Sequence, residues 1–258
     1  MSSFVIHEKQ GEVAVIRMND EKTLNAASLA MADELLDAFG MAARESRAIV
    51  FTGEGRGFCS GSNLFGLDPQ APDYDAGAPL VSHFNPMMSM LRNLPIPLVT
   101  AVNGVAAGIG CALALAGDMI LASERAYFLQ AFRRVALVPD GASAFLLTRA
   151  IGRVRAMEMM LMGERIPAAK ALDWGLINRV VLHEGLEDAA LAIASELAAG
   201  PVMALAMIRK MCWDSLETGF EGQLAADREM QRVAGGTADH REGFAAFIEK
   251  RSARFTGH

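Results

Sequence analysis

The sequence predicts an α/β fold followed by a region made only of helices. Two observations support this class. Strand-like apolar runs alternate with helical patterns up to about residue 180, and only helical patterns remain from residue 201 onward. The chain has 258 residues, about 1.7 times a typical domain of ~150 residues. We therefore expect residues 1–200 to form a core and residues 201–258 to form a helical appendage.

Short runs of β-branched and other apolar residues predict the strands. In chain order they lie at residues 5–6 and 13–18 around a turn at Gly11, then at 48–52, 97–103, 119–122 and 127–129. Residues 48–52 are almost entirely apolar, which is typical of a strand covered on both faces. This run leads into a glycine-rich loop, residues 53–62.

Helical periodicity predicts the remaining elements. They lie at residues 28–44, 82–93 and 110–116, in several helices from Ser143 onward with breaks near 163–167 and Gly175, and at 201–215, 220–233 and 239–250. In the first helix, Leu29, Leu35, Leu36 and Phe39 fall on one face. Residues 66–80 contain three prolines, three aspartates and two glycines, which predicts an exposed, mobile loop.

Composition excludes several classes of protein. Apolar residues make up 52% of the chain, which excludes disordered, collagen-like and disulfide-scaffold classes. The net charge of −6 argues against a nucleic-acid partner, because non-specific affinity for nucleic acid depends on basic surface. The three cysteines form no CxxC pair, and the N-terminus lacks a secretion signal. We therefore expect a cytoplasmic protein.

An uncharged run of 25 residues, 93–117, is long enough to cross a bilayer. Pro95, Pro97 and three glycines interrupt it, and it divides into a strand-like part and a helix-like part. A buried strand, turn and helix also produce a continuous apolar run, because both faces are covered. We favour this interpretation and expect no membrane partner.

Several common catalytic motifs are missing. The sequence has no GxxxxGK[ST] phosphate loop and no GxSxG serine elbow, and Leu113 breaks a dinucleotide fingerprint after Gly108-Ile109-Gly110. The five histidines are scattered without the spacing of metal ligands, so we expect no metal site.

Two glycine-rich turns follow predicted strands. One joins residues 51–53 to residues 60–62, and the other joins residues 102–104 to residues 108–110. They could be ordinary tight turns of an α/β protein. They could also present two backbone N–H groups to one oxygen, as an oxyanion hole does.

Asp140 lies in the segment Pro139-Asp140-Gly141, just before a predicted helix. It could belong to the N-cap region of that helix, where aspartate is a favoured residue. It could instead act as an acid or base, if an apolar pocket raises its pKa.

Together these segments resemble the enoyl-CoA hydratase/isomerase (crotonase) superfamily, from about Phe4 to Phe255. The resemblance is carried, in order, by Leu24-Asn25-Ala26, by residues 57–64 and 97–110 with Asp118, by residues 138–141 and 171–177, and by residues 242–251. It implies a spiral of ββα units, acyl-CoA thioester substrates, and a C-terminal helical part that assembles a homotrimer or a dimer of trimers. It implies no cofactor apart from the coenzyme A of the substrate.

The resemblance also implies roles for individual residues. The backbone N–H groups of Ser62 and Ile109 would bind the thioester oxygen. The substrate's coenzyme A would contact the residues that match family binding positions: Lys22, Ser62, Asn63, Leu64 and Phe65, with Phe247 and Lys250 acting on a neighbouring copy.

This chain departs from the hydratases at two positions. Hydratases of the family carry two glutamates that position and split water, and the matching residues here are Ala112 and Phe132. Phe132 would line the substrate site instead. Asp140 is retained, as in Δ3,Δ2-enoyl-CoA isomerase-like members, which implies a shift of a double bond from 3-enoyl-CoA to 2-enoyl-CoA.

Other reactions of the family remain open. A dehalogenase would use Asp140 as a nucleophile and needs a histidine, but the matching position is Asn85 rather than His83. Hydratase, hydrolase, decarboxylase and ring-isomerising members share the scaffold, and a fold does not decide among them. A catalytically silent acyl-CoA binder is the alternative outside enzymes.

Overall fold

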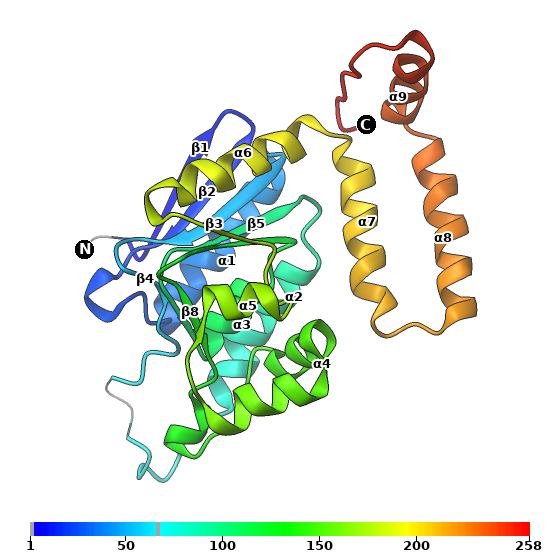
Figure 1. Ribbon diagram of the computed structural model, residues 1–258. Helices are drawn as coiled ribbons and strands as arrows, with labels where there is room; N and C mark the ends of the chain where they lie inside the picture. The colour runs from blue at the N-terminus through cyan, green and yellow to red at the C-terminus, as the bar shows by residue number, and fades with distance from the viewer. Residues whose placement is uncertain (1–2, 66–67) are drawn as a thin grey trace.

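Two sheets form the centre of the computed structural model, which describes residues 3–65 and 68–258 (Figure 1). The first has the order β1-β2-β3-β5-β7-β10 and the second the order β4-β6-β8-β9. The strands of the first sheet are β1 (Val5–Gln10), β2 (Val13–Met18), β3 (Ala48–Gly53), β5 (Leu98–Val102), β7 (Met119–Ser123) and β10 (Arg179–Val181). Those of the second are β4 (Gly57–Cys59), β6 (Val105–Ala107), β8 (Tyr127–Leu129) and β9 (Ile166–Pro167).

From β3 to β8, consecutive strands alternate between the two sheets. The chain passes from β3 to β4, from β5 to β6 and from β7 to β8, and each pair contributes one strand to each sheet. The neighbouring strands β3, β5 and β7 are parallel, as are β4, β6 and β8. The predicted α/β class and the spiral of ββα units are therefore confirmed.

Helices cover both faces of the first sheet (Figure 1). Those of the core are α1 (Leu29–Glu45), α2 (Asn85–Arg92), α3 (Ile109–Leu115), α4 (Ser143–Met162), α5 (Ala168–Asp173) and α6 (Leu186–Ala199). The hydroxyl of Ser28 caps α1 by accepting the N–H of Met31. Helix α6 packs over β3 and β5, and α1 packs on the opposite face, where it buries Met31 and Phe39.

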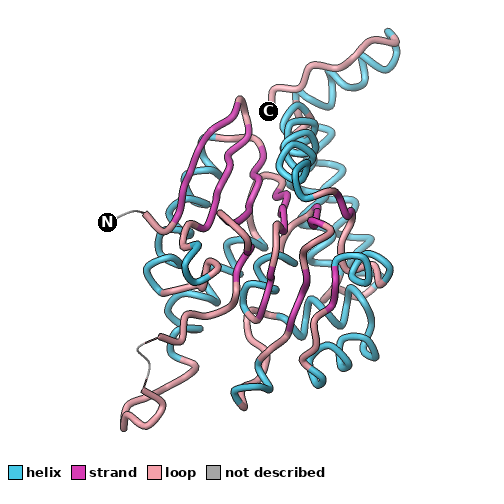
Figure 2. The backbone as a smooth tube through the Cα atoms, turned by 60° about the vertical axis from the view of Figure 1, so that its left-hand side comes forward, coloured by secondary structure: helices cyan, strands magenta, loops and turns pink. Residues whose placement is uncertain are grey.

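Three further helices extend away from the core (Figures 1 and 2). They are α7 (Val202–Ser215), α8 (Phe220–Gly235) and α9 (Ala238–Glu249). Helices α7 and α8 form a hairpin, and α9 packs against α8. This part contains no strand, as predicted.

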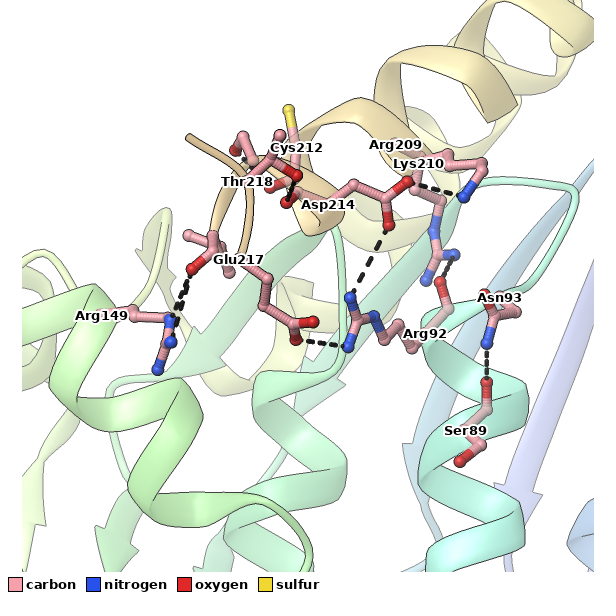
Figure 3. A network of polar contacts seen from close by, with 12 residues as sticks. Ser89, Arg92, Asn93, Arg149, Arg209, Lys210, Cys212, Asp214, Glu217 and Thr218 are labelled. Atoms are coloured by element: carbon pink, nitrogen blue, oxygen red, sulfur yellow. Dashed lines mark hydrogen bonds and ion pairs between the residues drawn. The ribbon is translucent and has the colours of Figure 1, made fainter. Parts of the chain in front are cut away.

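Arg209 fastens α7 to the core. Its Nε lies 2.7 Å from Asp118 Oδ2, and it donates to the main-chain oxygen of Arg92 at 2.7 Å. The Arg92 side chain extends in turn to Asp214 and Glu217, at and after the end of α7 (Figure 3). Burial raises the pKa of Asp118 although Arg209 acts in the opposite direction. The charges of Arg209 and Asp118 are therefore paired, and this contact fixes the position of the α7–α8 hairpin against the core.

The short elements differ most from the predictions. The glycine-rich loop 53–62 contains β4, and β6 lies within the predicted turn at 102–110. The predicted helix at 82–93 begins as a π-helical turn, Leu80–Phe84, that continues into α2. Within the predicted loop at 66–80, residues 66–67 lie outside the described residues, residues 68–77 form no helix or strand, and the helical turn that leads into α2 begins at Ala78.

The uncharged run 93–117 forms β5, β6 and α3, whose residues are all buried. Among the described residues, no single helix is long and apolar enough to span a bilayer. In residues 3–65 and 68–258, one bent pair of helices, His183–Ala199 and Val202–Ser215 with 110° between them, reaches that length and composition together.

Candidate active site

The first glycine-rich turn leaves the Ser62 N–H group free. Ala27 and Ser62 form a parallel bridge, in which Ala27 donates to Gly61 O at 2.8 Å and Asn63 donates to Ala27 O at 2.9 Å. In such a bridge the N–H of the central residue points away from the partner strand. No hydrogen bond among the described residues uses the Ser62 N–H.

The second turn also leaves an N–H group free, that of Ile109. Ile109 is the first residue of α3, and the first N–H groups of a helix have no partner within the helix. The preceding Gly108 donates to Leu129 O at 2.9 Å, whereas the Ile109 N–H has no acceptor in the described part of the chain. The positive end of the α3 dipole adds to the attraction for a negative oxygen.

The two turns touch each other. Gly61 has φ +110° and Gly108 has φ +54°, conformations that favour glycine. A Cβ on Gly108 would lie 3.9 Å from Gly61 Cα, and a Cβ on Gly61 would lie 3.3 Å from Ala107 O. The two free N–H groups therefore belong to adjoining turns, and each turn depends on a glycine for its shape.

Asp140 lies beside the first turn of α3. A Cβ on the next residue, Gly141, would collide with Ile109 Cδ1 and lie 2.8 Å from Ala112 Cβ. The Asp140 Oδ1 atom is buried and has no hydrogen-bond partner among the described residues. Burial raises the pKa of Asp140 from 3.8 to about 6, against a smaller effect of its own main-chain hydrogen bond.

The N-cap interpretation of Asp140 is wrong. Helix α4 begins at Ser143, its N-cap residue is Ala142, and no side chain caps it. Asp140 reaches the helix only through its main-chain oxygen, which accepts the Ser143 N–H at 2.9 Å. Its carboxyl group is thus left for another purpose.

The two positions predicted to match the hydratase glutamates adjoin the same turns. Ala112 is fully buried in α3, in contact with the Gly141 backbone region described above. Phe132 begins a 3₁₀ turn, Phe132–Val135, and a Cβ on Gly108 would lie 3.5 Å from its ring. Neither side chain can accept or release a proton, so both positions are apolar walls.

The residues predicted to contact coenzyme A divide into two places. Ser62 and Asn63 are half-buried, and the two residues after them, Leu64 and Phe65, are 51% and 86% exposed. Lys22 is exposed in the 3₁₀ turn Glu21–Thr23. Ser60 connects this turn to the 57–65 segment, because its Oγ donates to Thr23 O at 2.7 Å. Lys22 and residues 62–65 are therefore on neighbouring segments.

Phe247 and Lys250 lie elsewhere. Both are at the end of α9, and Figure 1 shows the C-terminal helices at a distance from α3 and the start of α4. Phe247 is 83% exposed, and Lys250 ends the helix with φ +54°. A single chain does not bring these two residues to Asp140.

The sequence did not reveal how the first turn is held. Asn25 is fully buried with φ +58°, and its Nδ2 donates to Glu54 O at 3.0 Å and to Gly57 O at 2.7 Å. Its Oδ1 accepts the N–H of Asp20. From the second turn, Asn103 donates to the same loop, at Gly53 O and Gly55 O. The Leu24-Asn25-Ala26 motif could have indicated this role, because asparagine is one of the few residues that tolerate a positive φ.

The histidine considered for a dehalogenase is already engaged. The His83 Nε2 atom lies 3.4 Å from Asp33 Oδ1 of α1, and its Nδ1 lies 2.6 Å from Ser82 Oγ. The matching position, Asn85, is exposed at the start of α2.

Comparison with known proteins agrees with this geometry. Residues 8–258 match the family described as enoyl-CoA hydratase/isomerase. The chain belongs to this family. It is therefore an acyl-CoA-processing enzyme of the crotonase superfamily.

Relatives carry names of both activities. The chain is 39% identical over 262 residues to 1,2-epoxyphenylacetyl-CoA isomerase of Escherichia coli K12, covering 100% of both chains. It is 40% identical over 245 residues to a protein of Rhodobacter capsulatus described as a probable enoyl-CoA hydratase, covering 95% of each. Its structure matches that of enoyl-CoA hydratase subunit I from Geobacillus kaustophilus with a TM-score of 0.92, at 31% identity and full coverage of both chains.

Proposed function

We propose that this enzyme is an isomerase that moves a carbon–carbon double bond of an acyl-CoA, from the 3-enoyl to the 2-enoyl position. One observation carries the proposal: Asp140 is a half-buried carboxyl group beside the α3 turn whose buried Oδ1 atom has no partner among the described residues, and the positions that match the hydratase glutamates are Ala112 and Phe132. A single carboxyl group suffices for a proton shuttle, whereas the usual hydration needs the two glutamates.

The proposed mechanism uses Asp140 as base and then as acid. The thioester oxygen accepts the N–H groups of Ser62 and Ile109. The ionised Asp140 carboxylate removes a proton from C2, and the electron pair spreads over the oxygen, C2 and C4 as a dienolate. The two N–H groups stabilise the negative oxygen because they are oriented before the charge develops. Asp140 then returns the same proton to C4, and the double bond moves to C2–C3.

The apolar walls support this chemistry. Ala112 and Phe132 bring no group that could hold a nucleophilic water, so the dienolate is protected from side reactions. A pKa of about 6 also suits a group that must both take and return a proton near neutral pH.

The remaining expectations complete the proposal. Lys22 and residues 62–65 would hold the coenzyme A part of the substrate, which is the only cofactor-like group required. Residues 201–258 would assemble three copies, or two such trimers, in the cytoplasm. Phe247 and Lys250, which one chain leaves far from Asp140, would then serve the site of a neighbouring copy.

A second candidate function is the isomerisation of an epoxide or ring on an aromatic-derived acyl-CoA. The observation that favours it is the 39% identity, over the full length of both chains, to a relative named 1,2-epoxyphenylacetyl-CoA isomerase. That reaction could use the same oxyanion turns and the same single carboxyl group.

The test is to incubate the purified protein with 3-enoyl-CoA, 2-enoyl-CoA and 1,2-epoxyphenylacetyl-CoA, and to identify the products by mass spectrometry. The first candidate predicts 2-enoyl-CoA from 3-enoyl-CoA, no rapid addition of water to 2-enoyl-CoA, and loss of turnover in Asp140→Ala. Rapid hydration, or full activity of the variant, would contradict it. Tight acyl-CoA binding without proton exchange in deuterated water would indicate a silent binder instead.

A further inference from the structure

Residues 251–258, which follow α9, turn back toward the junction of α6 and α7 (Figure 1). They form no helix or strand, and we call them the C-terminal strap. Lys250, which precedes the strap, has φ +54°, so the chain changes its direction there. Since the main-chain groups of the strap have no regular secondary structure to pair with, side chains must hold it in place.

The first turn of α9 binds the end of the strap through Asp239, which is only 4% exposed. Its Oδ1 accepts the Thr256 N–H at 2.7 Å, and its Oδ2 accepts the Gly257 N–H at 2.8 Å. Its own N–H donates to His258 O at 2.9 Å. Hydrogen bonds to an ionised acceptor are among the stronger ones in proteins, so the strap and the start of α9 form one unit.

The middle of α9 binds the strap as well. Glu242 pairs with Arg251 at 2.6 Å and accepts the Arg254 N–H at 2.8 Å, and these hydrogen bonds lower the pKa of Glu242 to about 2. The Phe255 ring lies against the helix, where a Cβ on Gly243 would be 3.3 Å from it. The strap is therefore attached to α9 over more than one turn of the helix.

One arginine of the core binds the strap from the other side. Arg47 is half-buried between α1 and β3, and its Nη1 donates to Thr256 O at 2.7 Å. Its Nε donates to Ala198 O at 2.6 Å and its Nη2 to Gly200 O at 2.9 Å, at the end of α6. The planar guanidinium fixes the directions of these donors relative to one another. Arg47 thus joins the strap, α6 and the start of β3 at one point.

The strap gives α9 a second connection to the core, in addition to the one through α7 and α8. The strap approaches Arg47 closely at Gly257, which has φ +88° and where a Cβ would lie 2.9 Å from Arg47 Nη1. Glycine adopts this conformation without strain. A helix held at one end can turn about the loop at 236–237, whereas a helix held by a connection on each side has a fixed orientation.

We infer that Arg47 is a positioning residue: by binding the strap it fixes the orientation of α9, and with it the placement of Phe247 and Lys250 toward a neighbouring copy. The inference rests on the proposed function for the role of these two residues in binding coenzyme A. It goes beyond that function because it assigns the position of α9 to a core residue that takes no part in the proton transfer.

The test measures kcat and KM for 3-enoyl-CoA together with hydrogen–deuterium exchange of α9, in the full-length protein. In Arg47→Met the exchange of α9 amides and the KM should each rise about tenfold, the effect of one hydrogen bond to a charged group. The kcat should stay within about twofold, because the proton transfer is unaffected. Arg47→Lys, which keeps the charge but not the fork of donors, should be intermediate. The control is Arg44→Met, which removes an exposed arginine of the last turn of α1.

A second variant releases the strap without altering the core. Gly257→Val places a β-branched residue at φ +88°, so it should raise the KM and the α9 exchange as Arg47→Met does. If the two residues act through the same contact, the double variant should have nearly the KM of either single variant.

An unchanged KM in Gly257→Val would overturn the inference, and so would a KM effect in the double variant equal to the product of the two single effects. A fall in kcat as large as the rise in KM would also overturn it, because it would indicate a general loss of structure. The proposed function is judged separately. If the unaltered protein does not isomerise 3-enoyl-CoA, that function fails, and the Kd of butanoyl-CoA measured by calorimetry then replaces KM in the same comparison.

Discussion

Replacing Asp140 by asparagine should lower the activity of the enzyme and raise its stability at pH 8. The burial that raises the pKa of Asp140 suits the proposed proton transfer, but it also destabilises the ionised carboxylate in the folded protein. The side chain keeps its shape, but it can no longer accept a proton. General acid–base groups typically contribute about 10²–10⁴-fold, and this enzyme has no second carboxyl at the Ala112 and Phe132 positions to substitute. We therefore expect kcat for isomerisation to fall by about 10³-fold or more, with a small change in KM.

The pH dependence follows from the raised pKa of Asp140. With a pKa of about 6, the carboxylate is about 90% ionised at pH 7 and about 10% ionised at pH 5. An aspartate with the ordinary value of 3.8 would still be more than about 90% ionised at pH 5. The kcat/KM of the unaltered enzyme should therefore fall about tenfold between pH 7 and pH 5.

The stability of the variant should change in the opposite direction. A group with a raised pKa in the folded state favours folding below its unfolded value, and this contribution is lost as the pH rises through the folded value. For Asp140 the window runs from 3.8 to about 6. That rise corresponds to roughly 3 kcal/mol, which partial solvent contact reduces to about 1–2 kcal/mol. At pH 8, Asp140→Asn should be more stable than the unaltered protein by this amount. At pH 4 the difference in stability should be smaller.

The assays are a coupled spectrophotometric measurement of isomerisation from pH 4.5 to 8.5, and urea unfolding at pH 4 and pH 8. Circular dichroism of the unaltered enzyme at pH 5 controls for loss of structure. A kcat/KM that stays flat down to pH 4.5 would refute the argument, since the catalytic group would then not be a carboxyl with a raised pKa. An Asp140→Asn variant less stable at pH 8 would show that the carboxylate has partners.

Three further predictions follow from the packing around α3 and α7. Ala112→Glu combined with Phe132→Glu should introduce measurable hydration of 2-enoyl-CoA, detected as loss of the ultraviolet absorbance of the conjugated thioester, whereas each single change should add little. Gly141→Ala should destabilise the fold by about 1–3 kcal/mol in urea unfolding, because its Cβ would overlap with side chains of α3. Arg209→Leu should lower the free energy of unfolding by about 3–5 kcal/mol, because it leaves the largely buried Asp118 carboxylate without its cation.

The long elements of the fold could be predicted because each carries its own periodicity. The strand of residues 13–18 and the three C-terminal helices were predicted within a few residues. β4, β6 and β9 contain only two or three residues each, too few for a period to be recognised. Their pairing partners are distant in sequence, so the second sheet becomes visible only when the spiral is closed.

The site was predictable in its glycines and its aspartate, but not in its contacts. Residue types alone suggested the turns at Gly61 and Gly108, whose positive φ values require little side chain. That the two turns touch is a non-local fact. The unpaired state of the Asp140 Oδ1 atom also depends on which neighbours the fold provides.

The loss of two acidic positions and the retention of Asp140 are physically one feature. Carboxylates that share a site raise one another's pKa, because like charges close together cannot all ionise. Glutamates at positions 112 and 132 would lie on the turns that adjoin Asp140. They would raise the pKa of Asp140 further and would offer water a place beside the dienolate. The Ala112→Glu, Phe132→Glu enzyme should therefore gain hydratase activity. In the pH profile of its remaining isomerase activity, the acidic limb should shift to a pH above 6. If the acidic limb of the pH profile is unchanged, carboxylates at positions 112 and 132 do not affect the pKa of Asp140. The apolar residues at these positions and the presence of Asp140 would then be independent features.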